Sequence, residues 1–541
     1  MSRLNILMIT THDINPHLGT YAGVWPGAEQ SVTPHLDRLA AEGIRFDSAF
    51  AAAPVCAPSR SAMMTGCYPT SIGTMHMRTR AVPPADVRLL PEIFRAAGYY
   101  TTNRFFTDYQ IAVPAVAFDD ISPTAHWRGR AEGQPFFAQF HGMRTHESQI
   151  YLDDEAFAEA TKDVRDDQRH DPAEMMIPPY YPDTPEFRKS WARYLDLITQ
   201  MDIETGQLLA ELEEDGLVDE TLVVFVSDHG LGMPRAKRWA TESGLREPLI
   251  MRCPGVIEAG TVEESIVSLV DLAPTLLTAA GIAVPEVMQG TPLLGSAARP
   301  RYVFGGRDRM DEQEDTVRTV RDERFRYIRN YHPDRSGMQH HEYADAMSTW
   351  HEFRRLLFEE ADQLARGEVP DRLTPLQRSI VAAARPEEEL YDVLADPHEE
   401  VNLAGNPAFR EDLVRLSGAL DEWQRELGDL GMIPEPELIE SWRPGGQQRV
   451  TAAPDIEVSD GRARISCATP GALLGWIPVS EAAGPTPHVQ ENPDPWTTML
   501  GVDPDRRPWR LCDGSVPVDE PILVKAWRLG YASSAEVEVH L

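Results

Sequence analysis

A cysteine at the predicted start of a short helix is the residue of this chain best placed to do chemistry. Cys56 precedes Ala57-Pro58-Ser59-Arg60. A helix start offers unpaired backbone N–H groups and a positive dipole end, and Arg60 adds a fixed cation. The side chain at position 56 would therefore face a spot that binds anions. The alternative is a buried core cysteine before a helix, the usual position of a lone cysteine.

Two polar pairs follow apolar segments that we predict to be buried strands. His12-Asp13 follows residues 4–10, and Asp228-His229 follows residues 221–227. Open α/β sheets place their sites at the carboxyl ends of such strands, and carboxylates and imidazoles bind metals. Asp228-His229 could instead be a polar cap, and His12 could be a loop histidine that bonds the backbone.

The elements that must position these residues alternate between apolar strands and amphipathic helices. This alternation predicts an α/β fold, with a mostly parallel sheet covered by helices on both faces. The expected strands and helices are 4–10, 33–43, 44–46, 89–98, 134–141, 187–214 and 221–227.

The character of the chain changes after about residue 300. An alternating segment at 316–331 is followed by a charged, helical stretch at 351–386 and a closing helix at 409–430. From about 445 the chain is rich in Pro and Gly, with strands expected at 462–467 and 522–527. We therefore predict a catalytic α/β domain at 1–375, a smaller α+β C-terminal subdomain at 376–444 and an appended β-sandwich at 445–541.

Composition limits the partners and the compartment. The 541 residues carry a net charge of −34, which argues against nucleic acid and anionic membranes as partners. No apolar run approaches the roughly 18 residues of a membrane span. Residues 4–10 are too short for a secretory signal, and five scattered cysteines suit a reducing compartment, so we expect a cytoplasmic protein.

The segment around Cys56 resembles the sulfatase signature Cys-x-Pro-x-Arg, including the Thr65-Gly66 that follows. Residues 389–404 resemble the C-terminal sulfatase motif "ELYD…DP…NLA". The resemblance implies an alkaline-phosphatase-like fold and a Cys56 oxidised to formylglycine by a formylglycine-generating enzyme. One hydroxyl of the hydrated aldehyde attacks sulfur, and the other later expels sulfate. A plain serine lacks that second hydroxyl.

The resemblance also implies a metal site and its neighbours. It would bind one divalent cation, generally Ca²⁺ in this family, although two imidazoles leave Mn²⁺ or Zn²⁺ open. Its ligands would be His12, Asp13, Cys56, Asp228 and His229. Arg60 would hold the formylglycine, Lys237 would touch the sulfate group and His146 could be the general acid. Lys237 could instead lie on a surface turn.

One block departs from the family. Many sulfatases carry a Lys and a His in a block after Gly-Tyr-x-Thr. In this chain those two positions fall near Phe106 and Asp108, and neither residue can take the role of the Lys or the His. The nearest substitutes are His76 and Arg78, which resemble the heparan N-sulfatase (sulfamidase)-like branch. His76 could equally be a histidine on a helix surface.

We therefore predict a metal-dependent hydrolase of sulfate esters or sulfamates, acting on a small-molecule or carbohydrate substrate. A phosphonate monoester or phosphodiester hydrolase is the first alternative, because it uses the same nucleophile and metal. A diester needs room for a second organic arm, and Phe105-Phe106 is expected to close that space. A non-catalytic binding protein on the same scaffold is the second alternative.

Overall fold

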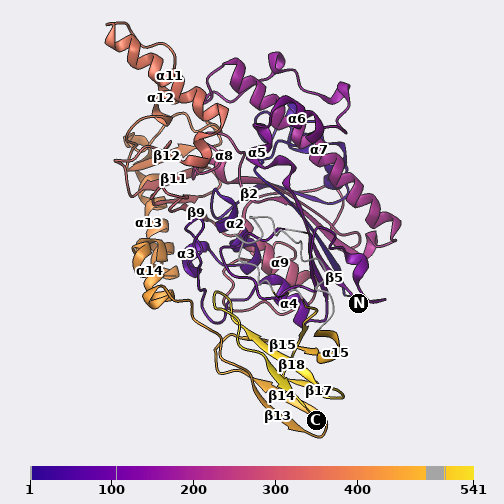
Figure 1. Ribbon diagram of the computed structural model, residues 1–541. Helices are drawn as coiled ribbons and strands as arrows, with labels where there is room; N and C mark the ends of the chain where they lie inside the picture. Colours follow the sequence, from indigo (N-terminus) through magenta and orange to yellow (C-terminus); the bar gives the residue numbers. More distant parts are fainter. Residues whose placement is uncertain (1–2, 105, 483–504, 506, 541) are drawn as a thin grey trace.

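An eight-stranded sheet forms the centre of the molecule, in the order β4-β3-β5-β1-β6-β7-β2-β8 (Figure 1). The computed structural model describes residues 3–104, 106–482, 505 and 507–540. The sheet is mostly parallel, as predicted, with β7 antiparallel to both of its neighbours. Its strands are β1 (Asn5–Thr11), β2 (Ile44–Phe50), β3 (Tyr100–Arg104), β4 (Asp120–Ile121), β5 (Phe136–Gly142), β6 (Thr221–Ser227), β7 (Arg246–Arg252) and β8 (Thr261–Ser268).

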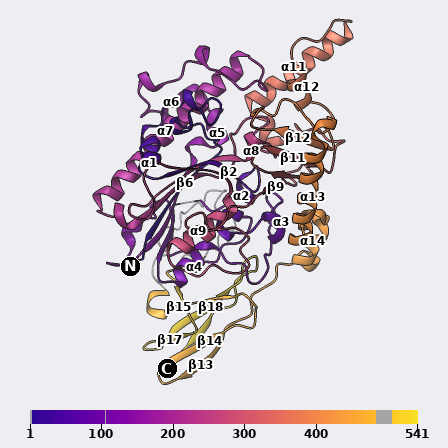
Figure 2. The ribbon, with the colours of Figure 1, turned by 180° about the vertical axis from the view of Figure 1, so that it is seen from behind.

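The central strands are apolar throughout because both faces of the sheet are buried. Alternate residues of β1 enter opposite cores: Ile6 and Met8 pack on one side, Leu7 and Ile9 on the other. The first side is covered by α2 (Cys56–Thr65), α4 (Leu90–Ala96) and α9 (Leu272–Ala279). The second is covered by α1 (Pro34–Ala41) and the long α7 (Pro185–Glu214). Figure 2 shows the same layers from behind.

A smaller antiparallel sheet of four strands follows, in the order β12-β11-β10-β9. The alternating segment forms a hairpin, with both strands inside the predicted range. The strands are β9 (Val303–Arg307), β10 (Val317–Arg321), β11 (Phe325–Asn330) and β12 (Glu388–Asp392). Strands β9 to β11 precede the proposed domain boundary at 375/376, and β12 follows it. The boundary therefore stays a prediction. Helix α13 (Arg410–Leu427) packs its leucines against this sheet.

The stretch expected to be helical at 351–386 is interrupted. Helix α11 (Ser348–Ala365) ends before Gly367, whose φ of +76° belongs to the left-handed region. Helix α12 (Pro375–Ile380) then begins with a proline in its first turn. Gly367 and Pro375 therefore divide the stretch into two separate helices.

The C-terminal residues form two antiparallel sheets that share one apolar core, as the predicted sandwich requires. One sheet contains β13 (Asp455–Ser459), β14 (Arg462–Ser466) and β17 (Ser515–Pro517). The other contains β15 (Leu473–Pro478), β16 (Arg510–Leu511), β18 (Ile522–Trp527) and β19 (Val537–Val539). The sandwich contacts the larger domain near α4 (Figure 1), where Arg95 donates to the carbonyl of Trp509 at 2.6 Å. Among the described residues, no helix has the length and apolarity of a membrane span.

Candidate active site

The carboxyl ends of β1 and β6 bring the two polar pairs together. These strands are parallel neighbours, with Thr11 opposite Ser227, so the residues that follow leave the sheet side by side. The backbone N–H of Asp13 donates to Asp228 Oδ1 at 3.3 Å. Asp13 has a φ of 53°, which turns the chain sharply at the end of β1. Residues 215 positions apart thus lie at one edge of the sheet.

Cys56 is the first residue of α2, and the whole helix is buried. Its Sγ lies 3.2 Å from Nε2 of His229. The hydroxyl of Ser59 donates to the carbonyl of Asp228, which ties this helix start to the loop after β6. Burial alone would raise the pKa of the Cys56 thiol, but the cations of Lys237 and His229 outweigh burial and hold that pKa well below its usual value. The site therefore favours a negative charge at position 56.

Four of the five predicted metal ligands form one compact cluster. His12, Asp13, Cys56 and Asp228 each offer an atom within 4.8 Å of the others, and all four are buried. Asp13 Oδ1, Asp228 Oδ2 and both ring nitrogens of His12 make no well-oriented hydrogen bond within the described part of the chain, and their polar contacts lie within the site, such as the 3.1 Å between His12 Nδ1 and Asp228 Oδ2. Buried polar atoms of native proteins are normally paired, so a donor set left open in this way fits a bound cation.

His229 completes the same cluster. Its Nε2 lies 3.2 Å from Asp13 Oδ1, and its Nδ1 lies 3.0 Å from the carbonyl of Gly230. A proton on Nδ1 donated to that carbonyl directs Nε2 toward the carboxylates, where either a proton or a metal ion can bind it. Burial lowers the pKa of His229, but Asp228 and Cys56 outweigh it and raise that pKa to about 9. The carboxylates therefore attract positive charge to this point.

Two backbone carbonyls orient the Arg60 side chain toward the metal cluster. Its Nε donates to Thr107 O at 2.9 Å and its Nη2 donates to Phe106 O at 3.2 Å. The other guanidinium nitrogen, Nη1, lies 3.9 Å from Asp228 Oδ2. The Phe106 ring lies 4.8 Å from the guanidinium carbon and 5.2 Å from the His12 ring. Phe106 therefore borders the site, whereas Phe105 lies outside the described residues.

Lys237 is buried beside the cluster, not on a surface turn. Its Nζ lies 2.9 Å from Asp13 Oδ2 and 2.8 Å from Glu147 Oε1. Glu147 also accepts two hydrogen bonds of 2.8 Å from Arg238. The backbone N–H of Arg238 donates to Pro54 O at 2.8 Å, which joins this network to the segment before Cys56.

Glu147, Arg238 and His141 also belong to the site, although the sequence alone did not predict them. Glu147 and Arg238 directly follow the predicted residues His146 and Lys237, which was the only pointer to them. His141 lies near the end of β5, and its Nδ1 lies 3.1 Å from Nη2 of Arg60. Burial, followed by the neighbouring Arg60 and His12, holds the pKa of His141 well below its usual value. Its imidazole is therefore neutral.

The two remaining predicted histidines lie in different places. The ring of His146 lies 5.9 Å from that of His12, and His146 clusters with Asp13 and Glu147, so it belongs to the site. His76 accepts a 3.3 Å hydrogen bond from the backbone of Arg309. Burial lowers its pKa, against the attraction of Asp308 and Glu435. No contact in the described ranges joins His76 to the metal cluster, and its role stays a prediction.

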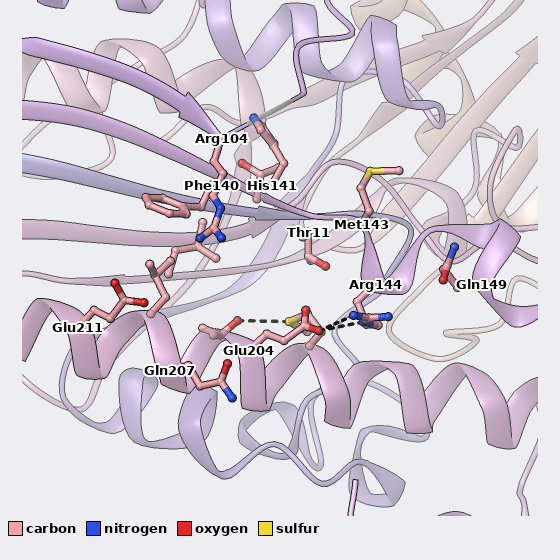
Figure 3. A pocket seen from close by; sticks show the side chains of 16 residues that line it. Thr11, Arg104, Phe140, His141, Met143, Arg144, Gln149, Glu204, Gln207 and Glu211 are labelled. Atoms are coloured by element: carbon pink, nitrogen blue, oxygen red, sulfur yellow. Dashed lines mark hydrogen bonds and ion pairs between the residues drawn. The ribbon is translucent and has the colours of Figure 1, made fainter. Parts of the chain in front are cut away.

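A pocket of about 490 Å³ opens beside the site, between the ends of β1, β3 and β5 and the helix α7 (Figure 3). His141 lines it and also contacts Arg60, which links the pocket to the cluster. Arg144 and Glu204 face each other across a 2.8 Å ion pair, and Arg104 lies over the Phe140 ring at 5.6 Å. Paired charges next to an aromatic ring suit a polar organic group better than a free anion.

Comparison with known proteins identifies the family. The family model described as "Sulfatase" matches residues 5–127 and 117–282, and that of "N-sulphoglucosamine sulphohydrolase, C-terminal" matches residues 235–378. An ulvan-active sulfatase of Formosa agariphila is 36% identical over 533 residues, covering 91% of this chain and 87% of that protein. Human N-sulphoglucosamine sulphohydrolase is 27% identical, covering 73% and 86%.

Solved structures show the same fold. A structure in complex with its substrate D-glucosamine-2-N,6-O-disulfate is similar with a TM-score of 0.53 and 20% identity, covering 79% of this chain and 98% of that one. The phosphonate monoester hydrolase of Silicibacter pomeroyi has a TM-score of 0.57 and 18% identity, covering 86% and 100%. The fold is therefore the alkaline-phosphatase-like one, shared by both hydrolase classes. Together with the family match over more than half of its length, the signature at Cys56 shows that this chain belongs to the sulfatase family and is a sulfuric ester hydrolase.

Proposed function

We propose that this enzyme hydrolyses sulfate esters or sulfamates of carbohydrates, with Cys56 converted to formylglycine as its nucleophile. The observation that carries the proposal is the position of Cys56 at the buried start of α2, with four metal-ligand candidates and Lys237 around it. A helix start surrounded by cations is suited to an anionic group in transfer. The formylglycine would be supplied by a formylglycine-generating enzyme.

A single divalent cation would be held by His12, Asp13, Asp228 and His229 together with position 56. Such an ion lowers the pKa of a bound hydroxyl and offsets the charge of a transferred sulfuryl group. The family favours Ca²⁺. Two imidazoles among the ligands make Mn²⁺ or Zn²⁺ chemically suitable as well.

The side chains around position 56 then have separate tasks. Arg60, fixed by the carbonyls of residues 106 and 107, would orient the nucleophile through Nη1, which makes no hydrogen bond to a described residue. Lys237 would hold a sulfate oxygen, since its ammonium already points to the cluster through Asp13. His146, at the rim of the cluster, would give a proton to the leaving oxygen or nitrogen.

The relatives support a carbohydrate substrate. One relative is named for activity on ulvan and another for N-sulphoglucosamine, and one solved neighbour holds a disulfated glucosamine. The pocket next to His141 offers about 490 Å³ with paired charges and an aromatic wall, which is room for a sugar beside the reacting group.

Mass spectrometry and kinetics on protein from its native host test the proposal. The peptide with position 56 should carry an aldehyde in place of the thiol, and kcat/KM should be higher for a sulfated sugar than for the matching phosphodiester. Cys56→Ala should abolish both reactions, whereas Cys67→Ala, which changes a buried cysteine just after the C-terminal end of α2, should keep the substrate preference. Unmodified cysteine in active enzyme, or faster turnover of the phosphodiester, would contradict the proposal.

A further inference from the structure

Three side chains with metal-binding chemistry meet beside the site described above, and none of them belongs to its metal cluster. Asp311 and Glu312 belong to the connection between β9 and β10, and His341 directly precedes α10 (Glu342–Asp345). One ligand atom from each residue lies within 4.8 Å of the other two. Two carboxylates and an imidazole from segments about 30 residues apart thus converge on one point.

His341 is the observation that points to a ligand. The side chain is only 1% exposed, and neither ring nitrogen has a hydrogen-bond partner in the described parts of the chain. The Trp350 ring packs edge-on against the imidazole, with 6.2 Å between the ring centroids, and offers it no hydrogen bond. A buried imidazole without partners is unusual in a native protein, and a metal ion would satisfy it.

The two carboxylates are free to supply the charge. Neither Asp311 nor Glu312 forms an ion pair with any other described residue. The backbone N–H of Glu342 donates to Glu312 Oε1 at 2.7 Å, which orients this carboxylate and leaves Oε2 available.

The nearby arginines are each paired with another carboxylate, although Asp311 also interacts electrostatically with Arg238. The pairs are Arg238 with Glu147 at 2.8 Å, Arg307 with Asp315 at 3.6 Å and Arg354 with Asp345 at 2.7 Å.

We propose that Asp311, Glu312 and His341 form a second divalent-metal site, separate from the one at Asp13 and Asp228. One imidazole with two carboxylates suits a first-row transition ion, Mn²⁺ or Zn²⁺, better than the all-oxygen environment that Ca²⁺ prefers. The ion joins the β9–β10 connection to the start of α10.

This link fixes a wall of the active site. Met310 precedes Asp311 and packs with Val55 and Ala57, the residues on either side of Cys56. An ion at Asp311 therefore limits the movement of the side chain that supports the start of α2. The second metal has a positioning role and contacts neither the nucleophile nor the sulfate.

Metal counting on the full-length chain tests the proposal without using activity. Metal-stripped protein is dialysed against Mn²⁺ or Zn²⁺ alone, and bound metal per chain is measured by elemental analysis. Wild type should bind two ions, and His341→Ala and Asp228→Asn should each bind one. Glu314→Gln removes an exposed acidic charge on the same connection and should keep two. Circular dichroism of each variant confirms that it is folded.

The outcomes separate this site from the catalytic one. A His341→Ala protein that is folded and still binds two ions overturns the proposal. So does a wild type that binds one ion while His341→Ala raises KM for the sulfated substrate, because these residues would then bind substrate. Failure of the proposed sulfate hydrolysis would leave the metal count unchanged, so the two conclusions are tested separately.

Discussion

Glu147 is expected to be essential for the stability of the active site, because one carboxylate compensates two buried cations. The side chain lies 2.8 Å from Lys237 Nζ and accepts two further bonds of 2.8 Å from Arg238. Burial would raise the pKa of Glu147, but Arg238 and Lys237 hold it far below its usual value. The change Glu147→Gln keeps the shape of the side chain and removes its charge.

The size of the effect follows from the burial of the network. Removing one partner of a buried ion pair costs about 3–5 kcal/mol, and glutamine keeps one acceptor oxygen, so a loss of about 3 kcal/mol is expected. Lys237 would then be held by Asp13 alone. A lost hydrogen bond between charged groups is worth about 1.5–3 kcal/mol, so kcat/KM should also fall roughly ten- to a hundredfold.

Urea unfolding followed by tryptophan fluorescence measures the stability, since the Trp350 ring lies 6.0 Å from the guanidinium carbon of Arg238. The control is Glu159→Gln, which breaks an ion pair with Lys162 of the same 2.8 Å length but with both side chains exposed. Water screens that pair, so its loss should leave the midpoint unchanged. Equal midpoints for the two variants would refute the argument from burial.

Three further predictions concern the metal, the pH dependence and the substrate. Chelation should abolish activity, and full activity in metal-free Asp228→Asn would exclude a catalytic metal. Burial raises the pKa of Glu92 from 4.5 to about 7, so this carboxyl destabilises the fold increasingly as pH rises from 4.5 to 7. Glu92→Gln should therefore add up to about 3 kcal/mol to the unfolding free energy above pH 7 and nothing below pH 4; a pH-independent difference in urea titrations would contradict this. Phe106→Ala should raise kcat/KM for a phosphodiester relative to a sulfate ester, and an unchanged ratio would show that Phe106 does not limit the second organic arm.

The strands buried on both faces could be predicted, because a short, continuous apolar run is typical of a strand that is covered on both sides of a sheet. β1 and β6 were located within one residue, and the polar pairs that follow them meet as expected. Strands β7 and β8 were missed. The first carries Arg246 and Glu247 and the second alternates exposed and half-buried residues at its start, so neither has an uninterrupted apolar pattern.

The partners inside the site could not be predicted, because sequence spacing does not tell which side chains meet across a fold. Lys237 was matched through its motif, but its bonds to Asp13 and Glu147 join residues far apart in the chain. His141 was seen only as the end of a strand, and its contact with Arg60 depends on the loop at residues 106–107. His76 follows the signature closely, yet the chain turns it toward Arg309.

Cys56 can be reached by another protein only while the domain around it is unfolded. In the folded chain the residue is 5% exposed, at the start of a helix whose other residues are buried as well. The loop that covers it comes from Asp228 and His229, more than 170 positions later, so the thiol stays open until β6 has been made and has paired with β1. Any enzyme that modifies Cys56 therefore competes with folding, and the fraction of modified chains depends on how slowly this long-range strand pairing forms.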